Sequence, residues 1–141
     1  MNRRLLLEQL QRHEGLRLKP YRDSVGKLTI GYGRNLADRG ISQEEAEFML
    51  DNDIDLVVAE LERMPLFLSL DPVRQVVLAN MAFNMGVPTL LEFRRMLGAL
   101  ARREWDRAAD EMLDSRWARQ VGRRAVELAR LMRTGVVADG D

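Results

Sequence analysis

The chain has 141 residues, with 22 basic and 22 acidic side chains, a net charge of zero and no cysteine. A chain of this length can bury about two-thirds of its unfolded surface in a single domain. The absence of cysteine excludes disulfides and thiolate chemistry, as suits a protein made in a reducing cytoplasm. No apolar run approaches the roughly 18 residues of a membrane span, and Leu5 to Leu7 is too short for a signal peptide. We therefore expect neither an export signal nor stable membrane association.

Charge is distributed unevenly along the chain. Residues 1–34 carry eight basic and three acidic groups, residues 35–62 carry one and nine, and residues 63–141 carry thirteen and ten. The acidic block is most simply the solvated face of one helix, and the basic segments around it favour an anionic polymer. Zero net charge and the lack of a clean recognition helix argue against a nucleic-acid partner.

The first predicted helix covers Arg3 to Gln11, where leucines recur at spacings of three and four along one face. From Leu16 to Gly33 the pattern changes to short apolar runs, and the segment Asp23-Ser24-Val25-Gly26 supplies turn residues between them. A small antiparallel sheet is therefore expected after the first helix. Gly31 and Gly33 flank Tyr32, so the backbone there can approach another group closely.

A second, longer helix begins at Ser42-Gln43-Glu44-Glu45, which is a capping box. Its apolar pattern continues for about twenty residues, or roughly 30 Å at the usual helical rise, and Met64-Pro65 ends it. So long a helix after so small a sheet is typical of a connector between a small lobe and the remainder of a chain.

The remainder is predicted to be helical. Asp71-Pro72 is a cap followed by proline at the first helical position, and the helix it opens is apolar nearly all round up to Gly86, which predicts a central buried helix. Further helices are expected after Val87-Pro88, around 93–100, at 105–113 and at 123–132, with a loose tail from 136 to 141. The methionines and tryptophans at helical spacing are expected in the core: Met49, Met81, Met96, Met112, Trp105 and Trp117.

Three chemically useful groups lie close together in the sequence, namely Glu14 at a helix end, Asp23 in the following segment and Thr29 six positions later. Glycoside hydrolysis needs two carboxyl groups, one that donates a proton to the leaving oxygen and one that stays ionised across the sugar. We expect the first to be the more desolvated, which favours Glu14, half-buried against its helix. Taken alone, the pair is more often a helix-end glutamate and a turn aspartate with no catalytic role.

The surrounding residues resemble the phage-type lysozymes, the endolysin family. The motif runs from Glu14 through eight residues to Asp23, through five more to Thr29, and then to Ile30-Gly31-Tyr32-Gly33. Similar motifs follow in the same order: Asn80 to Gly86, Arg102 to Ala109, Ser115-Arg116-Trp117, Gln120, Arg124-Ala125 and Arg133-Thr134-Gly135. The resemblance covers essentially the whole chain, with a short segment between Leu36 and Ser42.

This resemblance implies an α+β, mainly α, two-lobed lysozyme-like fold within one domain. The small lobe with its sheet would cover about 13–62, and the helical lobe about 63–135 together with the N-terminal helix, the two being joined by the long helix. It also implies an N-acetylmuramidase that hydrolyses the β-1,4 bond between N-acetylmuramic acid and N-acetylglucosamine in peptidoglycan. Glu14 matches the general acid, Asp23 the base or stabilising carboxylate, and Thr29 the hydroxyl that positions water.

The resemblance further places Phe83, Asn84 and Gln120 at substrate-binding positions and matches Arg124 to an arginine that pairs with the catalytic acid. The chain departs from the family in three places, one of which is Asn84, a shorter residue where the family has glutamine. It has Arg34 where the family often has histidine, and we expect this arginine to pair with Asp53 on the long helix. Val25 stands where a related enzyme has a glutamate that bridges the lobes.

Hydrolysis calls for no metal and no organic cofactor, and we expect a monomer. A lytic transglycosylase, which cleaves the same bond with the substrate's own hydroxyl, stays an alternative, although the presence of both Asp23 and Thr29 favours water as the nucleophile. A catalytically inactive glycan-binding module is the alternative from a different class. An endolysin of this kind would accumulate in the host cytoplasm and reach the periplasmic cell wall after release by a holin, and so bring about host cell lysis.

Overall fold

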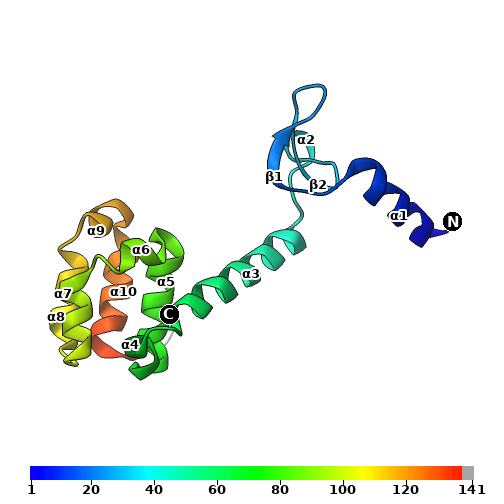
Figure 1. Ribbon diagram of the computed structural model, residues 1–141. Helices are drawn as coiled ribbons and strands as arrows, with labels where there is room; N and C mark the ends of the chain where they lie inside the picture. The colour runs from blue at the N-terminus through cyan, green and yellow to red at the C-terminus, as the bar shows by residue number, and fades with distance from the viewer. Residues whose placement is uncertain (138–141) are drawn as a thin grey trace. The chain divides into compact units, whose positions relative to one another are not determined.

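The computed structural model describes residues 1–137 and divides into two compact units, Met1–Met49 and a second that begins at Leu50. Figure 1 labels most of their helices and strands. The first unit contains a small antiparallel sheet and the second is helical, so the predicted α+β, mainly α fold is confirmed. The lobe boundaries expected from the sequence stay a prediction, and each unit is described by itself.

The first unit opens with helix α1, Arg3–Glu14. The side chain of Asn2 caps it by accepting a hydrogen bond from the backbone N–H of Leu5 at 3.0 Å. Gly15, with φ at +72°, ends it. The predicted helix is confirmed, but none of residues 3–14 is buried, so the leucine stripe of α1 is exposed.

Three short strands follow α1: β1, Arg17–Arg22, β2, Leu28–Gly31, and β3, Arg34–Asn35. They form an antiparallel sheet in the order β1-β2-β3, in which Thr29 on the central strand pairs with Tyr21 and Asn35. The register shifts between Arg17 and Tyr21, as at a β-bulge. A short helix α2, Leu36–Arg39, completes this part, and neither it nor β3 was predicted.

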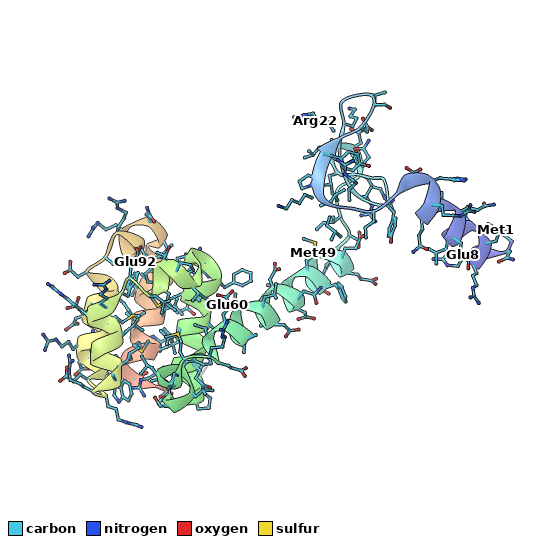
Figure 2. The ribbon with its side chains drawn as sticks, viewed as in Figure 1. Met1, Glu8, Arg22, Met49, Glu60 and Glu92 are labelled. Atoms are coloured by element: carbon cyan, nitrogen blue, oxygen red, sulfur yellow. The ribbon has the colours of Figure 1, made fainter. Side chains whose placement is uncertain are left out.

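Helix α3, Gln43–Leu61, has 19 residues and begins at the predicted capping box. The hydroxyl of Ser42 accepts a hydrogen bond from the N–H of Glu45 at 3.1 Å, and the Glu45 carboxylate accepts one from the N–H of Ser42 at 2.8 Å. Met49 on α3 is labelled in Figure 2. Its side chain is 51% exposed, so the prediction that it belongs to the core is wrong.

The helices that follow α3 lie side by side in the second unit (Figure 1), and their buried side chains form one apolar core. The helices of this unit after α3 are α4, Pro65–Ser69; α5, Pro72–Met85; α6, Val87–Leu90; α7, Arg94–Ala101; α8, Trp105–Leu113; α9, Arg116–Val121; and α10, Arg123–Thr134. Helix α10 packs against α8 and α5, and α7 packs against α8. Met81, Met96, Met112 and Trp117 are buried in this core as predicted, and Trp105 is half-buried against it.

Helix α5 is not buried all round, which corrects the prediction of a central buried helix. Val77, Leu78 and Met81 lie in the core, while Val76 and Phe83 are 58% and 42% exposed. The reason is geometric, because only one stripe of a helix can face a single layer of neighbours. The opposite stripe borders an open cavity of about 430 Å³ within the second unit.

Arg74 is a buried side chain that joins three helices of the second unit. Its Nε donates to the carbonyl of Met132 at 2.7 Å and its Nη2 to the carbonyl of Arg133 at 3.1 Å. Nη1 donates to Asp71 at 3.0 Å, and the guanidinium lies 3.9 Å from the centroid of the Trp105 ring. Arg74 therefore satisfies carbonyl groups at the end of α10 that the helix itself leaves unpaired.

The end of the chain agrees with the prediction as far as the structure describes it. Gly135, with φ at +68°, ends α10, and Val136 and Val137 lie in neither helix nor strand. Residues 138–141 of the expected tail lie outside the described residues. Across residues 1–137 no helix combines the length and the apolarity that crossing a bilayer requires.

Candidate functional site

The three predicted catalytic residues all belong to the first unit. Glu14 is the last residue of α1, Asp23 follows the end of β1, and Thr29 lies in β2. Figure 2 labels Arg22, the residue at the end of β1 next to the turn that carries Asp23. The chain thus gathers a helix end, a turn and the central strand within 16 residues of sequence.

Glu14 lies directly against the backbone of Gly33. A Cβ atom added to Gly33 would stand 2.7 Å from Oε2 of Glu14 and 3.1 Å from its Cδ. Gly33 also has φ at +76°, in the left-handed region that favours glycine. The expectation that this glycine pair lets the backbone approach another group is therefore confirmed at Gly33, whereas a Cβ at Gly31 would meet nothing within 4 Å.

The Asp23 carboxylate is oriented by the turn that follows it. Its Oδ1 accepts hydrogen bonds from the backbone N–H groups of Val25 at 3.0 Å and Lys27 at 2.8 Å. The backbone of Asp23 completes the turn by donating to the carbonyl of Lys27 and accepting from the N–H of Gly26. One carboxylate oxygen is thus held, while Oδ2 accepts no hydrogen bond from residues 1–137.

Thr29 is 3% exposed, and its hydroxyl donates to the carbonyl of Lys27 at 2.9 Å. Lys27 therefore contacts Asp23 through its N–H and Thr29 through its C=O. The hydroxyl oxygen of Thr29 can still accept a further hydrogen bond. Sequence reasoning missed the role of Lys27, because main-chain groups carry no signal in the identity of a side chain.

The expected order of exposure is wrong. Glu14 is exposed and Asp23 is half-buried, whereas the sequence favoured the opposite. The cause lies in the local structure, because the turn wraps around Asp23 while none of residues 3–14 is buried. Any desolvation of Glu14 has to come from outside its own helix.

The predicted substrate-binding residues belong to the second unit. Asn84 accepts a hydrogen bond from the indole N–H of Trp117 at 2.8 Å, which occupies its carbonyl oxygen. Phe83 borders the cavity of about 430 Å³, and Gln120 borders a separate open cavity of about 630 Å³. The binding roles of all three residues stay predictions.

Arg124 hydrogen-bonds within the second unit. Its Nε and Nη2 both donate to Oδ1 of Asn80, at 3.0 Å and 2.7 Å. The guanidinium also borders the cavity that Phe83 lines. Its pairing with the catalytic acid stays a prediction.

Arg34 pairs with Glu45, so the expected pairing with Asp53 is wrong. Nη1 and Nη2 of Arg34 donate to the two carboxylate oxygens of Glu45 at 2.8 Å and 2.7 Å, and Nη1 also donates to the carbonyl of Gly40. A carboxylate with two oxygens can serve the capping box and a two-point arginine pair together. The hydrogen bond from Arg34, with those from Ser42, lowers the pKa of Glu45 from 4.5 to about 2.

We expect this pair to make the first unit sensitive to acid. Because the pKa of Glu45 is lower in the folded state, its stabilisation is present above pH 4.5 and is lost as the pH falls toward about 2. The midpoint temperature of thermal unfolding should fall as the pH is lowered from 6 to 2. In Glu45→Gln this fall should be smaller. Glu44→Gln, at an exposed neighbouring position, is the matched control and should retain the wild-type slope. Equal slopes for Glu45→Gln and the wild type would contradict the assignment.

The sequence is similar to one protein family and to several known proteins. The family model described as phage lysozyme matches residues 11–133. The chain is 27% identical to a probable T4-type lysozyme of Dictyostelium discoideum, over 92% of this chain and 94% of that protein. It is 31% identical to a SAR-endolysin of Escherichia phage Mu, over 82% of this chain and 72% of that protein.

A third relative is a longer protein. The pre-baseplate central spike protein Gp5 of Enterobacteria phage T4 is 30% identical over 92% of this chain, but the match spans only 28% of the spike protein. The sequence therefore corresponds both to whole proteins and to one segment of a larger protein.

Proposed function

The chain belongs to the phage lysozyme family, and from this premise we propose that it hydrolyses the β-1,4 bond between N-acetylmuramic acid and N-acetylglucosamine in bacterial peptidoglycan. The observation that carries the proposal is the grouping of an acid, an oriented carboxylate and a hydroxyl in one small unit. Glu14 lies against Gly33, while Asp23 and Thr29 are linked through Lys27.

In the proposed reaction Glu14 donates its proton to the glycosidic oxygen as the bond from that oxygen to the anomeric carbon breaks. Water attacks the anomeric carbon from the opposite face of the sugar. Asp23 accepts the proton that the water loses, through the oxygen that the turn leaves open, and the hydroxyl of Thr29 orients the water.

The configuration at the anomeric carbon is proposed to invert, for which two carboxyl groups roughly 6.5–9.5 Å apart leave room for the water. Phe83, Asn84 and Gln120 are proposed to contact the glycan, and Arg124 is proposed to support the acid. Because Trp117 already holds the carbonyl oxygen of Asn84, the amide NH₂ of Asn84 is the group that can donate to a sugar.

The biological role that we propose is that of an endolysin acting on the host cell wall as a monomer, after release from the cytoplasm by a holin. The names of the relatives from phage Mu and from the Acyrthosiphon pisum secondary endosymbiont phage 1, a SAR-endolysin and an endolysin, support the endolysin part of this proposal. Clearance of a turbid suspension of purified peptidoglycan tests the activity, and a suspension that stays turbid would contradict it.

Replacing Asp23 with asparagine should lower kcat about a hundredfold, because an amide cannot accept the proton from water. The amide oxygen can still accept the hydrogen bonds from Val25 and Lys27, so the turn and the melting temperature should be retained. Release of soluble muropeptides measures kcat, with Asp51→Asn at an exposed site as the control. A loss of less than threefold would rule out Asp23 as the base.

A further inference from the structure

We propose that Gly33 is a positioning residue for the Glu14 carboxyl group, and this inference rests on the proposed function of Glu14 as the acid. Glu14 and Gly33 are 19 positions apart in the sequence but in direct contact. The three nearest atoms to a Cβ built on Gly33 all belong to Glu14, namely Oε2 at 2.7 Å, Cδ at 3.1 Å and Cγ at 3.4 Å. The Glu14 side chain therefore lies beside Gly33, next to the position that a Cβ atom of residue 33 would occupy.

Little else holds this carboxyl group in the first unit. Glu14 is exposed, and its side chain makes no hydrogen bond or ion pair with the other residues of the first unit, 1–49. Its helix ends at the next residue, Gly15, so no following turn of helix packs against it. Contact with Gly33 is therefore the restraint that the first unit itself places on where the acidic proton is delivered.

A methyl group at Gly33 would displace the carboxyl group rather than the backbone. To restore an ordinary contact of 3.4 Å, Oε2 has to retreat by about 0.7 Å. An exposed glutamate makes this movement at little cost, because no other contact within the first unit opposes a change of its side-chain torsions. The fold should then tolerate the substitution while the acid is misplaced, and a misplacement of about 1 Å can lower a rate about a hundredfold.

Gly31 supplies a matched control on the same segment. Its φ is +70° against +76° for Gly33, so alanine at either position carries a similar backbone strain. A Cβ at Gly31 meets nothing within 4 Å, so only the change at Gly33 reaches Glu14. The difference between Gly33→Ala and Gly31→Ala isolates the contact from the strain.

We expect Gly33→Ala to have a kcat about a hundredfold below that of Gly31→Ala, with KM within about twofold and equal melting temperatures. Adding Gly33→Ala to Glu14→Gln should cause no further loss, because the methyl group then displaces a side chain that no longer donates a proton. Equal kcat values for the two alanine variants would overturn the proposal.

Two readouts do not depend on catalysis. The ¹³C chemical shift of the Glu14 side-chain carboxyl should change in Gly33→Ala and stay unchanged in Gly31→Ala, and an unchanged shift in both would overturn the proposal. If Gly33→Ala melts below Gly31→Ala, then adding Glu14→Ala to Gly33→Ala should remove the difference in melting temperature. A difference that persists would also overturn the contact. A wild-type protein that leaves peptidoglycan intact would refute the proposed function, and the chemical shift would still test the contact.

Discussion

Replacing Glu14 with glutamine is expected to lower kcat on peptidoglycan by about a thousandfold, because an amide cannot deliver a proton to the leaving oxygen. The substitution keeps the size and shape of the side chain and therefore its contact with Gly33. Glu14 is exposed and makes no hydrogen bond within the first unit that the amide would break, so the melting temperature of that unit should be unchanged. Initial rates of muropeptide release, measured with thermal unfolding of the same samples, check both expectations.

Glu8→Gln is the matched control for this experiment. Glu8 lies on the same helix, is exposed and pairs with Arg4, so its loss changes charge on α1 without reaching the site. An exposed i,i+4 pair contributes only about 0.3–0.5 kcal/mol. Activity of Glu8→Gln near the wild-type level, with Glu14→Gln inactive, supports the assignment. Turnover by Glu14→Gln within tenfold of the wild type would remove Glu14 from the mechanism.

Replacing Arg74 with methionine is expected to destabilise the helical unit by about 3–5 kcal/mol, the range measured when one partner of a buried charged network is removed. The carbonyls of Met132 and Arg133 and the carboxylate of Asp71 would all lose a donor. The stacking on Trp105 would be lost as well. A drop in melting temperature of roughly 15 °C or more should follow, measurable by circular dichroism.

Arg63→Met provides the comparison, because Arg63 is exposed and its loss should shift the melting temperature by only a few degrees. Arg74→Lys refines the test. A lysine keeps the positive charge but cannot donate to three separate acceptors from one rigid plane, so it should recover only part of the stability. Equal melting temperatures for Arg74→Met and Arg63→Met would contradict the role given to this buried arginine.

The main helices and the sheet could be predicted because their signals are local. The capping box at Ser42 and the Asp71-Pro72 pair specify where α3 and α5 begin, and both are found there. Strand β3 and helix α2 were missed because two and four residues are too few to establish a period. Helix α9, six residues that begin after Ser115, was missed for the same reason.

The partners of side chains were harder to predict than the elements. Arg34 was expected to pair with Asp53 on the long helix, yet it pairs with Glu45, whose carboxylate also serves the capping box. Met49 follows the helical apolar period and is still exposed, because period alone does not say which faces a unit covers. The same holds for Val76 on α5.

At the site, sequence reasoning identified the types of residue but not how they are held. Asp23 and Thr29 could be singled out by their chemistry and spacing, whereas their link through the backbone of Lys27 depends on the conformation of one turn. Close approach at the Gly31–Gly33 pair could be expected from the absence of Cβ atoms. Its partner, Glu14, could not, because contact across 19 positions is set by how α1 meets the sheet.

Digestion of peptidoglycan in ¹⁸O-labelled water, followed by mass spectrometry of the muropeptides, tests most directly whether Glu14 and Asp23 cleave the glycan with water. The expected products end in reducing N-acetylmuramic acid that carries one ¹⁸O atom, and the Glu14→Gln protein should release none of them. Products with unlabelled anhydromuramyl ends, or a glycan that is bound and left uncut, would contradict hydrolysis by this pair.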